Sequence, residues 1–209
     1  MTDGRAPKIT YITPKWNGLK LGASYTIHNA HRRGMTSRYV DYETNEDGYT
    51  FAAQKEWILS KRAKLYNSFG YGVFNSTDKE FSIGSKFEYC RFNIGAGYKK
   101  AYIDGNKNPI STTRKSIYLP AYFDNFRESQ SWNISTGYNW DKFKTNLALL
   151  HTQAKNTRHQ DTLFIFSNAY NLTKMIEIYG VATHLNAHST THNKDNKGVS
   201  LITGIGLRF

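Results

Sequence analysis

The feature that most constrains this chain is an alternation of apolar residues with polar or small ones, and it is clearest at the C-terminus. Successive side chains of a β-strand point to opposite faces of a sheet, so a two-residue repeat predicts a strand with one apolar face. The terminal residues on one side are Val199, Leu201, Thr203, Ile205, Leu207 and Phe209, and those on the other are Ser200, Ile202, Gly204, Gly206 and Arg208.

The same repeat recurs through most of the chain and predicts an all-β protein. The clearest examples are residues 19–27, 81–89, 91–99, 132–140 and 143–149. Three segments are harder to assign to faces. In 49–59, Lys55 falls among the apolar positions, and in 163–170 both faces carry apolar residues. In 175–184, we expect Glu177 to point inward, which turns its neighbours outward.

The aromatic residues indicate membrane-spanning strands. They make up 15% of the chain, yet the chain is polar on average. Many stand at the ends of expected strands, as in the two aromatic girdles of outer-membrane barrels. These are Tyr25, Phe81, Tyr89, Tyr98, Trp132, Trp140, Phe143 and Phe209.

The opposite faces carry Gly, Ser, Asn and charged residues, which suits a water-filled lumen. The charged side chains that we expect to line this lumen are Lys20, Lys86, Glu88, Arg91, Lys99, Lys144, Glu177 and Arg208. Charged walls bias the passage of ions through a pore. Because cations predominate in this set, we expect a mild preference for anions in a closed pore.

The connections between expected strands alternate in length, as do the periplasmic turns and extracellular loops of outer-membrane barrels. Short ones are expected at 14–17, 59–62, near Cys90, at 140–141 and at 171–173, and longer ones at 28–45, 75–79, 101–130, 153–160 and 187–197. This gives about eleven strands, so the first, Lys8–Thr13, runs inward like the last. Both termini of such barrels are periplasmic, so we expect further strands before Lys8.

Composition argues against several other classes. Lys and Arg outnumber Asp and Glu by 28 to 16, giving a net charge of +12. These charges are spread along the chain without a nucleic-acid-binding motif, which disfavours a nucleic-acid partner. No apolar run reaches the roughly 18 residues of a transmembrane helix. Residues 1–7 lack the apolar core of a signal peptide, and the single Cys90 cannot form an intramolecular disulfide.

Three stretches resemble the Gram-negative porin family, especially the porins of alphaproteobacteria. Residues 8–14 (KITYITP) with 18–26 (GLKLGASYT) resemble the hairpin that follows the constriction loop in those porins. Residues 170–174 (YNLTK) are similar to the penultimate turn of the family. The end of the chain, with Ile205, Leu207 and Phe209, resembles the terminal signal read by the outer-membrane assembly machinery.

The resemblance implies one domain, residues 1–209, that is an N-terminally truncated antiparallel transmembrane β-barrel of the Gram-negative outer membrane. Family porins have sixteen strands and usually form trimers, so this chain would be their C-terminal two-thirds. The implied function is passive diffusion of small hydrophilic solutes and ions, with no catalytic step, cofactor or metal. The implied partners are outer-membrane lipid, the assembly machinery and two further copies in a homotrimer.

Other interpretations stay open at this point. They are a structural or adhesive outer-membrane barrel without a channel, a non-functional porin fragment, and a basic soluble β protein. A zinc site at His184, His188 and His192 would need a helix, whereas 186–197 has the composition of a loop. A ten-stranded outer-membrane protease would need to bring together acidic residues and a histidine at the extracellular rim. The candidates are Asp124, Glu128, His151, His159 and Asp161.

Overall fold

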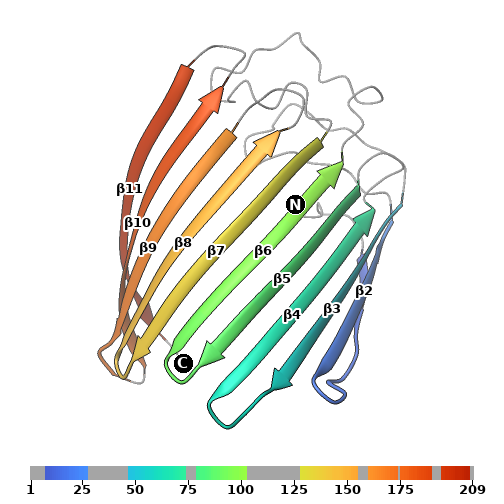
Figure 1. The fold of residues 1–209 in the computed structure, drawn as a ribbon, viewed down its shortest axis with the longest axis horizontal. Helices are drawn as coiled ribbons and strands as arrows, with labels where there is room; N and C mark the ends of the chain where they lie inside the picture. Colours follow the sequence, from blue (N-terminus) through green and yellow to red (C-terminus); the bar gives the residue numbers. More distant parts are fainter. Residues whose placement is uncertain are drawn as a thin grey trace.

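The computed structural model describes residues 8–27, 47–73, 79–102, 128–154, 160–173, 175–189 and 194–207, and these form one antiparallel sheet of 11 strands (Figure 1). The strands are β1 (Lys8–Ile12), β2 (Leu19–Thr26), β3 (Gly48–Ile58), β4 (Ala63–Val73), β5 (Lys79–Tyr89), β6 (Phe92–Tyr102), β7 (Glu128–Trp140), β8 (Phe143–Ala154), β9 (Gln160–Asn171), β10 (Ile176–Ser189) and β11 (Lys194–Leu207). The expected all-β antiparallel fold is confirmed.

The sheet is a meander in which each strand pairs with its neighbours in the sequence. Short turns connect β1 to β2, β3 to β4, β5 to β6, β7 to β8 and β9 to β10 at the lower end in Figure 1, called here the turn end. These are the five short connections predicted from the sequence. The other end is called the loop end.

Three of the turns depend on left-handed backbone conformations. Asn17 and Gly18 have φ values of 45° and 79°, and Cys90 and Asp141 have values of 53° and 45°. At Gly18 a side chain is disfavoured for two reasons. The positive φ strains residues other than glycine, and a Cβ atom would collide with the carbonyl oxygen of Glu56. The Gly18 carbonyl in turn accepts a hydrogen bond of 2.9 Å from the Glu56 amide, which holds this turn against β3.

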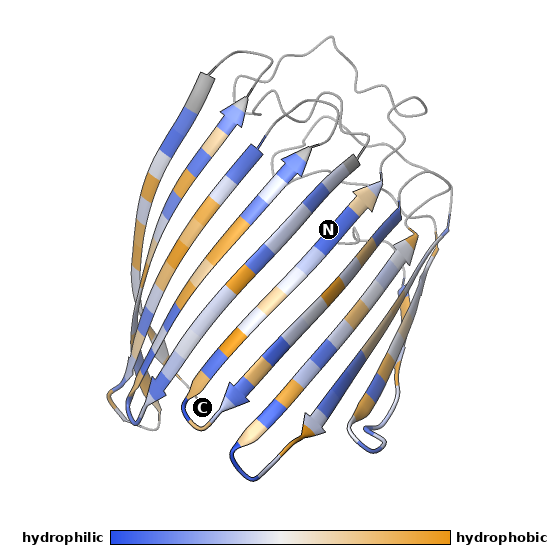
Figure 2. Cartoon of the chain, in the orientation of Figure 1, coloured by the Kyte–Doolittle hydropathy of each residue, from blue (hydrophilic) through white to orange (hydrophobic). Residues whose placement is uncertain are grey.

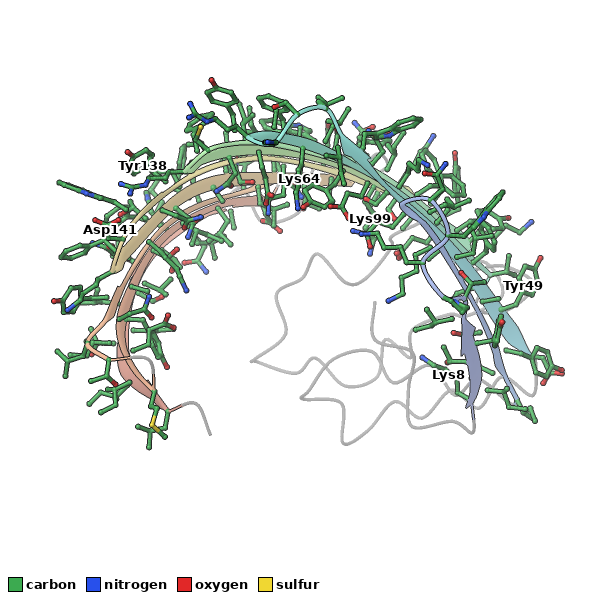
Figure 3. All side chains as sticks on the ribbon, turned by 90° about the horizontal axis from the view of Figure 1, so that it is seen from below. Lys8, Tyr49, Lys64, Lys99, Tyr138 and Asp141 are labelled. Atoms are coloured by element: carbon green, nitrogen blue, oxygen red, sulfur yellow. The ribbon has the colours of Figure 1, made fainter. Side chains whose placement is uncertain are left out.

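The sheet curves into an open arc with a convex and a concave face (Figure 3). Lys64 and Lys99 lie on the concave side of the arc and Tyr49 and Tyr138 on the convex side. The register is continuous in every strand pair, and successive residues of a strand alternate between the two faces. The faces of these four residues therefore show whether any other strand position is convex or concave. Figure 2 shows the resulting alternation of hydropathy along the strands.

The large apolar side chains do not pack into a dry interior. Within the described residues the buried apolar side chains are Ala63, Val73 and Ala101. Leu147 and Leu201, on the convex face, are 53% and 74% exposed. A soluble sandwich would bury such residues between two sheets, and this arrangement is absent from the described strands.

Aromatic residues mark both ends of the convex face. At the turn end the exposed ones include Trp57, Tyr89, Phe92, Trp140 and Phe143, and at the loop end Tyr25, Tyr49, Tyr71, Tyr102 and Trp132. Phe143 also packs against Tyr170 with ring centroids 4.6 Å apart. Two bands of aromatic residues, separated by a largely aliphatic band that also contains Phe69, Phe164 and Phe166, match the outer surface of a membrane barrel.

The structure differs from the sequence-based expectation near the C-terminus. Residues 187–197 were expected to form a loop, but β10 continues to Ser189 and β11 begins at Lys194. The polar composition of these residues was misleading, because Ala187 pairs with Asn196 and His188 with Asp195 in a regular antiparallel ladder. Backbone pairing extends the hairpin beyond its apolar part.

The apolar character of the convex face predicts an asymmetric effect of charge in the middle of β8. Leu147 is convex and Ala148 is concave. In lipid vesicles Leu147→Lys should destabilise the folded state by about 2–4 kcal/mol, because it places an ammonium group in hydrocarbon. Ala148→Lys should cost less than about 1 kcal/mol. Reversible denaturant unfolding measures both values, and equal costs would contradict the assignment of the faces.

Candidate functional site

The concave face carries most of the charged side chains of the strands and is the candidate functional site. Of the residues predicted to line a lumen, Lys20, Lys86, Glu88, Lys99, Lys144 and Glu177 have concave positions in the register. From β4 to β7 the other concave positions are Gly, Ser and Asn, apart from Lys64, Tyr66, Glu80 and Ala101. This part of the face is therefore hydrophilic.

Most of the concave charges are paired with an opposite charge. Lys86 Nζ lies 2.7 Å from Glu88 Oε1 on the same strand. Lys99 Nζ on β6 lies 2.8 Å from Glu80 Oε1 on β5, and Lys144 Nζ on β8 lies 3.4 Å from Glu177 Oε2 on β10. Ion pairs of this exposure contribute little to stability, so their main effect is on the local electric field.

A larger ionic cluster lies toward the turn end of β3, β4 and β5. Glu56 on β3 pairs with Lys15 from the first turn and with Lys64 on β4, whose Nζ is 3.3 Å from Glu56 Oε1. The Nζ of Lys86 lies 5.8 Å from the ring centroid of Tyr66, within cation–π range. With Glu88, this cluster carries three lysines against two glutamates.

Small residues keep the concave wall thin between these charges. Gly137 on β7 lies between Asn93 on β6 and Asn146 on β8, its two partners in the register. A Cβ atom at Gly137 would lie 2.7 Å from Asn93 Nδ2 and would collide with Asn146 Oδ1. Glycine here lets two amide side chains lie flat over the sheet.

Among the described side chains, sequence reasoning missed five charged residues with concave positions, namely Lys8, Glu56, Lys64, Glu80 and Asp161. Lys55 obscured the alternation of β3. In the structure Lys55 is on the convex side, where its ammonium reaches back to the Asn17 carbonyl and lies 4.7 Å from the Trp57 ring. Treating Lys55 as an interfacial lysine would have exposed the inward position of Glu56.

One predicted lumen residue is placed differently, and another is not described. Arg91 lies in the turn after β5, and its Nη2 is 2.8 Å from Asp141 Oδ1 in the next turn along the sheet. It therefore lies at the turn-end rim. Arg208 lies outside the described residues. Of the expected assembly signal, Ile205 and Leu207 are on the convex face, 67% and 61% exposed, and Phe209 lies outside the described residues.

A meander of tilted strands with an aromatic-banded convex face and an ionic concave face is the architecture of a porin wall. The sequence matches the profile of the Gram-negative porin family over residues 1–190. This chain belongs to the Gram-negative porin family. The family indicates an outer-membrane location and a channel rather than an enzyme.

Solved porins share the fold of this chain. An anion-selective porin from Comamonas acidovorans aligns with a TM-score of 0.58 and 12% identity, over 96% of this chain and 57% of that chain. A porin refined at 1.8 Å resolution aligns with a TM-score of 0.62 and 11% identity, over 97% of this chain and 60% of that chain. The outer membrane channel DcaP of Acinetobacter baumannii aligns with a TM-score of 0.63 and 10% identity, over 96% of this chain and 62% of that chain. A search of curated proteins gave no match.

This chain thus spans less than two thirds of the length of these porins. In its described residues the sheet has two edges, β1 and β11. The described residues contain no helix of the length and apolarity that crossing a bilayer requires. The all-β porin fold predicted from the sequence is confirmed, and the barrel is not closed within the described residues.

The catalytic and metal-binding alternatives are not assembled in the described residues. His151 lies on the convex face, with Nδ1 2.9 Å from Thr162 Oγ1, whereas Asp161 has a concave position. Asp124 and His159 lie outside the described residues, as does His192, and the side chain of Glu128 is likewise not described. His184 and His188 are four strand positions apart, roughly 13 Å, which is too far to share a metal. No group of three metal-binding side chains occurs in the described part.

Proposed function

We propose that this porin forms a passive diffusion channel for small hydrophilic solutes and ions, with the concave face as its wall. The observation that carries the proposal is the division of one sheet into an apolar convex face and a concave face whose β4–β7 part is lined by ion pairs, hydroxyls and amides. Hydrocarbon accepts the first face and water the second, so the sheet is suited to enclose an aqueous path.

A channel requires the two edges of the sheet to be closed, since unpaired backbone groups are costly in hydrocarbon. All neighbouring strands are antiparallel, so β1 and β11 run in the same direction. An entirely antiparallel closure therefore needs an odd number of additional strands. Five strands would give the sixteen of the family, and we propose that they belong to a segment preceding Lys8 in the working channel.

We further propose that the C-terminal residues serve assembly. Ile205 and Leu207 are successive apolar residues on the convex face of β11, and Phe209 continues the same alternation in the sequence. Such a strand suits recognition by the outer-membrane assembly machinery, which the resemblance to porins implies. A homotrimer is the corresponding proposal for the assembled state.

The channel proposal predicts stepwise ohmic conductance in planar lipid bilayers, together with heat-modifiable migration in detergent. Two adjacent substitutions on β7 provide a matched pair. Ser135→Trp projects from the concave face and should lower the unit conductance, whereas Ile134→Trp projects toward lipid and should leave it unchanged. A heat-modifiable barrel without conductance would instead support the non-conducting structural alternative.

We propose a mild anion preference from the charges of the described concave face. It carries Lys8, Lys20, Lys64, Lys86, Lys99 and Lys144 against Glu56, Glu80, Glu88, Asp161 and Glu177. Within the described strands Lys20 has no ion pair, so its charge is not compensated locally. Excess uncompensated positive charge attracts anions into the channel.

Two substitutions should shift this preference in opposite directions. Lys20→Glu should move the reversal potential in a salt gradient toward cations, and Glu80→Gln, which removes the partner of Lys99, should move it toward anions. For a permeating ion about 10 Å from the substituted side chain in water, each change should alter the anion-to-cation permeability ratio on the order of twofold. The effect should be smaller at high salt, which screens the charge. Shifts in the same direction would contradict the proposal.

A further inference from the structure

The short turns at the turn end carry an excess of positive charge. In the described turn residues, 13–18, 59–62, 90–91, 141–142, 172–173 and 175, the charged side chains are Lys15, Lys61, Arg62, Arg91, Asp141 and Lys142. Lys15 pairs with Glu56 of β3, and Arg91 pairs with Asp141. The other three, Lys61, Arg62 and Lys142, are exposed and have no ion pair among the described residues. These three residues are called here the basic rim.

Backbone hydrogen bonds hold the turns of the basic rim side by side. Three such bonds, each of 2.8 Å, run from the amides of Cys90, Asn139 and Asn171 to the carbonyls of Arg62, Arg91 and Lys142, respectively. The ion pair of Arg91 with Asp141 adds a link between two side chains of neighbouring turns. The backbone positions from which the cations project are therefore fixed relative to one another.

The basic rim lies beside the aromatic band that marks the turn end of the convex face. Trp140 and Phe143 flank the turn that contains Lys142, and the band continues along the sheet through Phe92, Tyr89 and Trp57. Aromatic bands of this kind lie at the membrane–water interfaces of outer-membrane barrels. The cations of the turns, which follow directly after the band, are therefore at the depth of the lipid headgroups.

Lys55 places a further cation at the same depth on the lipid-facing surface. It has a convex position on β3, yet its ammonium extends to the Asn17 carbonyl in the first turn and lies 4.7 Å from the Trp57 ring. Long basic side chains near an interface extend toward the headgroups in this way. Lys55 has no acidic partner among the described residues, so its charge is also available to lipid.

We infer that the basic rim, together with Lys55, binds anionic phospholipids in the leaflet that meets the turn end. The Arg62 guanidinium can hold two phosphate oxygens at once, whereas the lysines attract the headgroup as point charges. A zwitterionic phospholipid carries its own ammonium group beside the phosphate, so its attraction to the basic rim is weaker. The acyl chains of the bound lipid then cover the apolar convex face next to the turns.

The inference goes beyond the proposed channel. It requires the convex face to lie in a bilayer, but it requires no open pore and no particular solute. The basic rim gives the membrane contact a lipid preference at one end of the sheet, where the convex face by itself accepts any acyl chain.

Cys90 offers a reporter for this preference, because it is the single cysteine of the chain and is exposed in the turn that bonds to Arg62. The protein, labelled at Cys90 with a fluorophore, is folded into phosphatidylcholine vesicles. Equal small fractions of phosphatidylglycerol or phosphatidylcholine, each with a nitroxide near the top of one acyl chain, then serve as quenchers that differ only in the headgroup. The apparent association constant should be roughly threefold to fivefold higher for phosphatidylglycerol, since one nearby basic residue favours an anionic lipid by about that factor.

Removal of the basic rim should weaken the preference. The variant Lys61→Gln/Arg62→Gln/Lys142→Gln should lower the ratio of the two association constants by about half or more. High salt should lower the ratio in the unsubstituted protein, because the Debye length falls to about 3 Å at about 1 M ionic strength. The three side chains are exposed, so the variant should keep heat-modifiable migration in detergent.

The matched control removes the same charge from the other end of the convex face, as Lys79→Gln/Lys100→Gln/Lys197→Gln. These positions lie roughly 30 Å along the strands from the turns, well beyond the Debye length. The ratio measured at Cys90 should therefore not change.

Equal quenching by the two lipids in the unsubstituted protein, or an unchanged ratio in the rim variant, would overturn the inference. An equal fall of the ratio in the control would also overturn it, because net charge and not the basic rim would then set the preference. The measurement needs no ionic current, so its failure and that of the channel are distinct. Absence of conductance would refute the channel alone, and absence of a lipid preference would refute this inference alone.

Discussion

Backbone hydrogen bonding is the constraint on which the rest of the structure depends. In hydrocarbon, each unpaired N–H or C=O group costs several kcal/mol, so a strand can span a membrane only between two partners. The meander from β1 to β11 satisfies this condition for every interior strand. In the described residues the outer edges of β1 and β11 lack such a partner, and the proposed channel requires both edges to be paired.

The pleat then divides function between the two faces. Once pairing fixes the register, every second residue is committed to one side, and a single-residue slip would exchange the faces. The continuous register places Lys86, Lys99 and Lys144 opposite in direction to Phe87, Tyr98 and Leu147. A polar, partly charged wall and an apolar outer surface therefore arise from the same strands, although β8–β10 also carry aliphatic residues such as Leu150, Leu163 and Leu185 on the concave side.

Sequence alternation predicted the all-β fold, the five short turns and the concave position of six charged residues, because these depend only on local period. It did not assign the faces of β3, since Lys55 interrupts the pattern and its interfacial position depends on the turn at Asn17. The ion pair of Arg91 with Asp141 joins two turns that only the sheet brings together. The extension of β10 to Ser189 was missed because polar strand ends lack an apolar face.

The central claim is that the convex face meets hydrocarbon and the concave face meets water. Spin labels placed one at a time at residues 145–150 of β8, in a Cys90→Ser background, test it directly in lipid vesicles. Collision rates with oxygen, which concentrates in lipid, and with a water-soluble nickel complex should alternate out of phase from residue to residue, with Leu147 and Leu149 favouring oxygen. Parallel profiles, or oxygen preference at Asn146 and Ala148, would contradict the account.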